Sequence, residues 1–259
     1  MIFGNYFVFL HAMKRIIVIF FLFSVIAQAG NKIYSPTIKT LTTIVNSDWQ
    51  NRPVIELGSS DILTIGFDEL SHDAHRYIYH LTRCEADWSK STEVFDSDWL
   101  EGFNDYPIDD YENSLNTTVS YTHYEFHIPN RQCRILMSGN YRLSIYDEDA
   151  SHEKVLEAEF YVVKPSVKIQ LGMTTNTDID VNKSHQQISM AINYDDIHVT
   201  RPDEELYTVV MQNWNEKTAR INPQPSYIQQ RSLQWEHHRE LIFDAGNEYH
   251  KFEVIDVSH

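Results

Sequence analysis

The stretch from Arg76 to Asn130 decides the fold, and it reads RYIYHLTRCEADWSKSTEVFDSDWLEGFNDYPIDDYENSLNTTVSYTHYEFHIPN. Near its start, Tyr77, Tyr79 and Leu81 alternate with other residues, which places their side chains on one face of a strand. The run from Tyr124 to Ile128 alternates in the same way near its end. We therefore expect two half-buried strands that bracket the residues between them.

The connection between these strands, Cys84 to Ser120, is long, acidic and rich in aromatic residues; we call it the excursion. Connections of this length are usually functional or disordered. A disordered segment contains few aromatic residues, so we expect an ordered excursion that packs back on the sheet. Its aromatic residues either form an interface, with Trp99 and Phe103 as anchors, or make the excursion's own small core. The candidates are Trp88, Trp99, Phe103, Tyr106 and Tyr111.

Five sequence blocks follow one another in and after this stretch: RCEADW, WLEGF, DYENSLNTT, SYTHYEFHIPN and SGNYRLSIY. The matching residues are Tyr79–Trp88, Leu100–Phe103, Asp110–Thr118, Tyr121–Asn130 and Ser138–Tyr146. In this order they resemble the first domain of the type IX secretion system plug protein of the Bacteroidota. A looser match runs from FYVVKPSV, residues 160–167, to GNEYHKFEV, residues 246–254.

The resemblance implies a non-enzymatic periplasmic protein without a cofactor. Such a protein docks on the periplasmic side of the outer-membrane translocon β-barrel and closes the pore while no substrate is loaded. Proteins of this family continue beyond their second domain, so residues 165–259 are expected to be a second β domain in a shortened chain. The alternative is an exported carbohydrate-binding β-sandwich module, because sandwiches that carry aromatic residues often hold sugars.

Strand patterns fill the rest of the chain, and no amphipathic helix of three turns appears after the leader. We expect an all-β protein with two antiparallel, immunoglobulin-like β-sandwich domains, residues 30–164 and 165–259, hinged near Lys164-Pro165. Further strands of the first domain are expected at Thr37–Val45, Val54–Leu57, Ile62–Phe67, Tyr141–Ile145 and Leu156–Val162. Those of the second are expected at Val167–Leu171, Gln187–Ile192, Leu206–Gln212, Leu233–Trp235 and Tyr249–Val257.

The first 29 residues have the order of a secretory signal peptide. Lys14 and Arg15 precede an apolar run, Ile16–Ile26, and the small residues Ala27-Gln28-Ala29 follow it, with Met13 as the natural start. Cleavage after Ala29 is expected, and an uncleaved anchor is the alternative. Loss of the two basic residues takes the formal net charge from −16 to −18. So acidic a surface argues against nucleic acid and anionic lipid as partners, and no later segment is apolar enough to span a bilayer.

Metal binding and catalysis find no support in the sequence. His123 and His127 share a strand face with Glu125, but four positions along a strand separate the two histidines by about 13 Å. The acids between Asp96 and Glu112 lack the glycine that an EF-hand calcium loop requires. There is no G-x-S-x-G, H-E-x-x-H, G-x-x-x-x-G-K-[ST] or C-x-x-C motif. We therefore expect no metal site and no enzyme.

Two cysteines, Cys84 and Cys133, follow the leader and both lie beside strand patterns. An exported protein can oxidise such a pair to a disulfide. Cys84 lies within the family block RCEADW, whereas Cys133 lies outside every block. This asymmetry favours two independent thiols, with a bridge as the alternative.

Overall fold

The computed structural model describes residues 30–71 and 73–246. Strands account for 46% of the structure and helices for 6%. The strands form antiparallel sheets, which confirms the all-β sandwich class. The expected signal peptide, residues 1–29, and the expected strand Tyr249–Val257 lie outside the described residues. Residues 31–164 are called the first region below, and residues 165–246 the second region.

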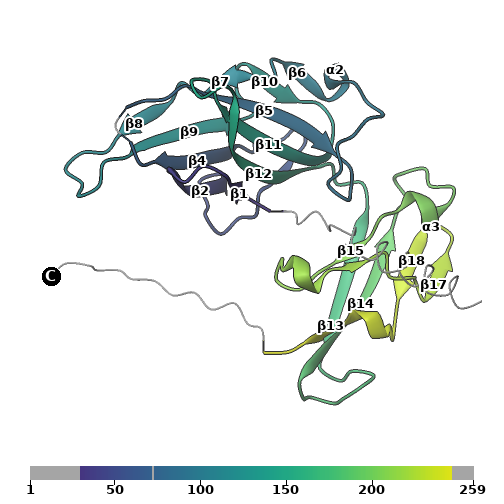
Figure 1. Ribbon diagram of the computed structural model, residues 1–259. Coiled ribbons are helices and arrows are strands. Elements are labelled where there is room, and N and C mark those ends of the chain that lie inside the picture. The colour runs from purple at the N-terminus through teal and green to yellow at the C-terminus, as the bar shows by residue number, and fades with distance from the viewer. Residues whose placement is uncertain (1–29, 72, 247–259) are drawn as a thin grey trace, which may run out of the picture. The chain divides into compact units, whose positions relative to one another are not determined.

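Two sheets form the first region (Figure 1). The larger has the order β1-β12-β11-β5-β7, with β3 beside β12. Its strands are β1 (Lys32–Ile33), β3 (Val54–Glu56), β5 (Tyr77–Cys84), β7 (Tyr106–Pro107), β11 (Gly139–Asp147) and β12 (Glu153–Val163). The smaller has the order β2-β4-β9-β8, with β2 (Ile38–Val45), β4 (Leu63–Glu69), β8 (Tyr111–Asn113) and β9 (Thr122–Ile128). A separate ribbon pairs β6 (Leu100–Gly102) with β10 (Cys133–Ile135).

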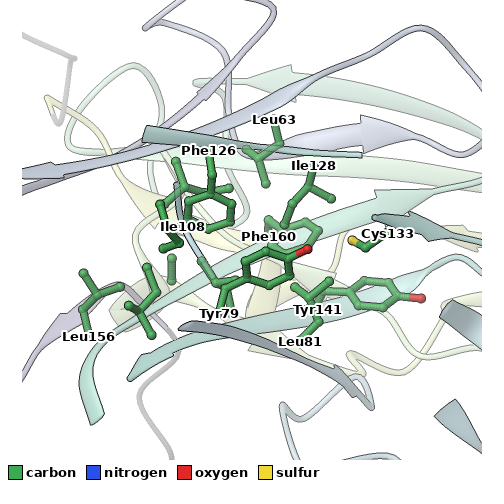
Figure 2. Close-up of a cluster of buried hydrophobic side chains, with 14 of the residues drawn as sticks. Leu63, Tyr79, Leu81, Ile108, Phe126, Ile128, Cys133, Tyr141, Leu156 and Phe160 are labelled. Atoms are coloured by element: carbon green, nitrogen blue, oxygen red, sulfur yellow. The ribbon is translucent and has the colours of Figure 1, made fainter. Parts of the chain in front are cut away.

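Aromatic side chains fill the space between the two sheets. Tyr79 of β5 stacks on Phe126 of β9 with ring centroids 5.2 Å apart, and Tyr77 meets Tyr124 edge-on at 4.9 Å. Figure 2 shows Tyr79 and Phe126 among the aliphatic side chains of this core. The alternation in β5 and β9 therefore has the predicted meaning: one face of each strand is buried in the core.

Several details of the first region go beyond the sequence predictions. The pairing of β12 with β3 is parallel, whereas its other pairings are antiparallel. Strands β1, β6, β7, β8 and β10 are only two or three residues long, too short to show a period. Residues 155–160 of β12 are buried on both faces, so this strand is covered on the side opposite the core as well.

The second region has its own sheet, of order β13-β14-β18-β17, with β19 beside β14. The strands are β13 (Lys168–Thr174), β14 (His185–Asn193), β17 (Tyr227–Gln229), β18 (Ser232–Trp235) and β19 (Ile242–Asp244). A ribbon pairs β15 (Val209–Val210) with β16 (Arg220–Ile221), and the short helices are α3 (Pro202–Glu205), η1 (Glu216–Thr218) and η2 (Arg239–Leu241). Its core consists of Met190, Ile192, Tyr194, Leu233, Trp235 and Leu241. This core is separate from that of the first region, and the domain boundary at Lys164-Pro165 stays a prediction.

The strand expected at Leu206–Gln212 was wrong in extent. Only Val209 and Val210 are strand, because α3 begins at Pro202 and Leu206 ends it as the C-cap. Positive φ angles at Asn213 and Trp214 then turn the backbone out of the extended region directly after this segment. The apolar run has the composition of a strand, but the helix before it and the turn after it limit the extended part to two residues.

Candidate interaction surface of the excursion

The excursion is ordered, and contacts at both of its ends hold it to the sandwich. At the first end, Cys84 forms an isolated bridge with Lys90. Further on, the side chain of Asn104 takes the place of a strand partner: the backbone N–H of Leu81 donates to Asn104 Oδ1 at 2.7 Å, and Asn104 Nδ2 donates to the Leu81 carbonyl at 2.9 Å. The excursion then supplies β7 to one sheet and β8 to the other. The prediction that it packs back on the sheet is confirmed.

Trp99, one of the two expected anchors, is a core residue. It is 2% exposed, and its ring lies 5.5 Å from that of Tyr141 on β11. It is the last residue of the short helix α2 (Asp96–Trp99), and its carbonyl accepts a hydrogen bond from the Leu136 N–H. Trp99 therefore belongs to the main core of the first region, and not to a separate small core of the excursion.

Phe103, the other expected anchor, is 66% exposed. Its backbone is fixed, since its N–H donates to the Gln132 carbonyl at 2.8 Å. Gly102 makes this close approach feasible: its φ is +104°, and a Cβ there would lie 1.9 Å from the Gln132 oxygen. The glycine of the WLEGF block thus holds β6 against β10 and presents Phe103 to solvent.

The other three aromatic candidates differ in how far their side chains are exposed. Trp88 is buried but outside the main core, where its ring packs edge-on against Tyr161 of β12 at 5.3 Å. Tyr106 is partly buried, and its hydroxyl accepts from Gln132 Nε2 at 3.4 Å. Tyr111 is about half exposed, with its ring 5.8 Å from Tyr124.

The structure adds exposed apolar residues that sequence reasoning did not single out. Phe95, before α2, is 80% exposed, and Leu136, after β10, is also exposed. Together with Phe103 these residues form what we call the aromatic end. A shallow hollow of about 540 Å³ lies beside them, lined by residues of α2, β6 and β10. At the opposite end of the sandwich, the loop joining β8 to β9 projects with Leu115 and Val119 exposed (Figure 1).

Charged side chains lie near the aromatic end. The excursion holds ten acidic residues and one lysine. Arg134 Nε donates to Glu101 Oε2 at 2.7 Å across the β6–β10 ribbon, while His80 Nδ1 lies 2.6 Å from Asp105. A surface of exposed apolar side chains inside an acidic rim can bind another protein, and it disfavours phosphate groups.

The polar face of β9 carries a chain of contacts in which each histidine already has a carboxylate or hydroxyl partner. His123 Nδ1 lies 2.6 Å from Asp68, and His127 Nδ1 lies 3.0 Å from the Thr64 hydroxyl. Glu125 lies between the two imidazoles, 3.8 Å and 3.6 Å from their Nε2 atoms. Among residues 30–71 and 73–246, no group of three His, Cys, Asp or Glu side chains is placed to hold a metal ion.

Cys84 and Cys133 are both buried as free thiols. Burial raises the pKa of each thiol and so disfavours the reactive thiolate. Independent thiols, the favoured alternative, are what the structure contains.

The family model of the type 9 secretion system plug protein 1st domain matches residues 38–164. This part of the chain is similar to the first domain of the type IX secretion plug family. All five quoted blocks lie inside this plug domain, which confirms the resemblance on which they were grouped. The family ties the domain to type IX secretion and to the cell envelope, and it is not an enzyme family. In the described part of the chain, no helix has the length and apolar character needed to cross a membrane.

A solved relative extends beyond the plug domain. A hypothetical protein from Parabacteroides merdae ATCC 43184 matches at a TM-score of 0.83 and 35% identity, over 90% of this chain and 59% of that chain. The chain thus spans less than two thirds of this relative's length. An alkylpurine DNA glycosylase from Pseudomonas fluorescens matches at a TM-score of 0.24 and 16% identity, over 52% of this chain and 31% of that one, and carries no argument. No curated protein matches the chain.

Proposed function

We propose that this chain is an exported, non-enzymatic component of the type IX secretion machinery. It binds the periplasmic side of the outer-membrane translocon β-barrel and closes it while no substrate is loaded. The observation that carries the proposal concerns the excursion of the plug domain. This connection is firmly held to two sheets, and it still exposes large apolar side chains at the ends of the sandwich.

The fixed backbone of the excursion favours binding. Ordering a flexible loop on binding costs free energy, and a preorganised surface avoids most of that cost. Here Gly102 and the Asn104 side chain hold the backbone on both sides of Phe103. Phe103 can then enter a partner's pocket with little loss of conformational entropy.

The aromatic end is the principal contact in this proposal, because Leu136 lines the shallow hollow there and Phe95 and Phe103 adjoin lining residues in the sequence. Aromatic side chains in such positions often supply most of the binding free energy. The acidic residues of the rim select a partner with basic residues around its own apolar pocket. Charge at the rim acts mainly on the association rate, so binding should weaken as salt increases.

A carbohydrate-binding module would present a row of aromatic rings along one face of a sheet. The exposed aromatic residues of the excursion, Phe95, Phe103 and Tyr111, instead come from three separate segments: before α2, after β6 and on β8. This arrangement supports a protein partner over a sugar.

The test measures recovery of the translocon barrel from outer-membrane extracts by variants of this protein. Phe103→Ala should lower the affinity about thirtyfold, as loss of about 2 kcal/mol predicts, and leave the melting temperature unchanged. Leu115→Ala, at the opposite end, is the matched exposed control and should bind normally. Trp99→Ala should lower both the melting temperature and the affinity for the barrel, because it opens the core.

Barrel recovery that is unchanged by Phe103→Ala and by Phe95→Ala would refute the aromatic end as the contact. Loss of binding with Leu115→Ala alone would move the contact to the β8–β9 loop. Recovery of glycans but no barrel protein would support the carbohydrate module instead.

Export is the other part of the proposal, and it depends on the leader. Mass spectrometry of the protein from the periplasm should show Gly30 as its first residue. A mature protein that keeps Lys14 and Arg15 would contradict cleavage at this site.

A further inference from the structure

A second shallow hollow of the first region lies where β2 and β9 end and β4 begins, because Val45, Leu63 and Ile128 are paired there. It has a volume of about 500 Å³, and its lining consists of six polar and two apolar residues. The polar ones are Asn46, Ser47, Thr64, His127, Asn130 and Arg131. We call this feature the arginine hollow. None of its lining residues is acidic, although the chain has a formal net charge of −16.

Two asparagines fix the two turns that form the walls of the arginine hollow. In the turn after β2, the N–H of Asn46 donates to the Ile62 carbonyl at 3.0 Å, and its Oδ1 accepts from the Ile62 N–H at 3.0 Å. In the turn after β9, Asn130 Oδ1 accepts from the N–H groups of Gln132 and Cys133 at 2.8 Å and 2.9 Å. The residue that follows each asparagine in the hollow therefore has a backbone position that is set before any ligand binds.

Those two following residues are Ser47 and Arg131, and their side chains are hydrogen-bond donors. Across residues 30–71 and 73–246, neither the Ser47 hydroxyl nor the Arg131 guanidinium has a hydrogen-bonding or ionic partner. Arg76, another exposed arginine of the first region, differs in this respect, since its Nε lies 2.6 Å from Glu148. A guanidinium has five N–H donors and no acceptor. The hollow thus offers donors to a ligand that supplies acceptors.

The acidic side chains nearest to the hollow already have donors of their own. Asp61 Oδ1 accepts from Asn46 Nδ2 at 2.8 Å, and Asp61 Oδ2 accepts from the Glu56 N–H at 2.9 Å. Glu125 Oε1 lies 3.6 Å from His127 Nε2. These contacts occupy both carboxylates outside the lining of the hollow, and they leave the Arg131 guanidinium for a ligand.

We propose that the arginine hollow binds a single carboxylate group of a protein partner. A planar guanidinium can donate two parallel hydrogen bonds to the two oxygens of a carboxylate, and the Ser47 hydroxyl can donate a third. Ligands with several phosphate groups are disfavoured, because the ten acidic residues of the excursion repel polyanions. The carboxylate belongs to an acidic side chain or to a chain end of the partner.

The arginine hollow adjoins the aromatic end in the fold. Gln132 follows Arg131 directly, and its carbonyl accepts the hydrogen bond from the Phe103 N–H at 2.8 Å. A partner that covers Phe103 therefore reaches the hollow and presents its carboxylate beside its own apolar pocket. This last step rests on the proposed function, whereas carboxylate binding by the hollow does not.

The first test titrates small carboxylates into the ¹⁵N-labelled full chain and follows the amide signals of Ser47 and Gln132 by NMR. N-acetylglutamic acid amide represents an acidic side chain, N-acetylglycine represents a chain end, and the tighter of the two identifies the source. Inorganic phosphate should bind more weakly than both. Arg131→Gln should lower the affinity for the tighter probe at least about fivefold. Arg76→Gln is the matched control, and it should change that affinity less than about twofold.

Three results overturn carboxylate binding: no saturable shift with either carboxylate, equal losses of affinity in the two arginine variants, or tighter binding of phosphate. The second test measures recovery of the translocon barrel from outer-membrane extracts. Arg131→Gln should lower recovery, and Arg76→Gln should not. Unchanged recovery by Arg131→Gln overturns the link to the aromatic end. If the unaltered protein recovers no barrel, the proposed function fails, and the NMR titration still decides whether the hollow binds a carboxylate.

Discussion

Strands β12 and β13 are neighbours in the sequence, yet they lie at the two extremes of burial. Residues 155–160 of β12 are all buried, whereas all seven residues of β13 are exposed. Both alternate apolar side chains with other residues: Leu156, Ala158, Phe160 and Val162 in β12, and Ile169, Leu171 and Met173 in β13. β12 has β11 on one side and β1 and β3 on the other, while in the described part of the chain β13 pairs with β14 alone. Position in a sheet, and what covers its faces, decides burial here more than local sequence does.

The same contrast extends to the two regions. Among the described residues, the core cluster of the first region has 25 buried members and that of the second has six. Hydrophobic stabilisation grows with the apolar area removed from water. The first region should therefore stay folded when residues at the edges of its sheets are changed. The second region has the smaller core, so its stability depends more on what covers its sheet.

The largest expected effect is the loss of a core side chain from β12. Phe160 is 1% exposed, and its ring stacks on Tyr141 at 5.6 Å. Phe160→Ala should lower the free energy of unfolding of the first region by about 3–5 kcal/mol, because it leaves a cavity between the sheets. Phe103→Ala is the control with the same atoms removed from an exposed position, and it should change stability by less than about 0.5 kcal/mol. Urea unfolding measures both, and equal losses would contradict the burial assigned to β12.

A smaller effect is expected at the charged pair on the covered outer face of β12. Arg142 Nη2 donates to Glu159 Oε1 at 3.0 Å, with Glu159 buried. Glu159→Gln leaves the guanidinium without its carboxylate and should cost about 1–3 kcal/mol. The exposed pair of Arg134 and Glu101 is the matched control, and Glu101→Gln should cost at most about 1 kcal/mol. If both substitutions cost the same, the outer face of β12 is more hydrated than its burial indicates.

Acid should weaken the same face of β12. Burial alone would raise the pKa of the Glu157 carboxyl, but hydrogen bonds from Lys154 Nζ at 2.5 Å and from the Tyr34 hydroxyl at 2.6 Å outweigh it and lower that pKa. The bond to Glu157 also raises the pKa of Tyr34 to about 12. Because the folded-state pKa of Glu157 lies below the unfolded one, its stabilisation is complete above the unfolded value. It is lost as the pH falls through the folded value.

Glu157→Gln should therefore lower the melting temperature at neutral pH, and the difference from the unaltered protein should shrink as the pH falls below about 4.3, the ordinary pKa of a glutamate. Thermal melts followed by circular dichroism across this range measure the difference. A difference that does not change with pH would show that the carboxylate contributes nothing through its charge.

The sequence predicted those parts of the fold that carry a period. Alternation located β5 and β9 and the faces they bury, and the charge pattern marked the polar face of β9. It did not place Trp99 in the core, because an aromatic residue in a connection has no period that reveals its direction. Phe95 was missed for the same reason. The exposure of β13 depends on the number of strands beside it, which no local pattern records.

The smallest expected effect tests whether β13 is as uncovered as β12 is covered. Leu171→Ala removes a side chain of β13 that is 68% exposed. It should change the free energy of unfolding by less than about 0.5 kcal/mol, because it leaves no cavity. Hydrogen exchange of the β14 amides measures it, since these amides report the opening of the second region alone.

Met190→Ala is the buried control, because Met190 lies opposite Leu171 on β14 and is 5% exposed. It should cost about 2–5 kcal/mol, since it opens the core of the second region. A loss with Leu171→Ala as large as the loss with Met190→Ala would show that the apolar face of β13 is covered. The contrast with β12 would then disappear, because both strands would be buried.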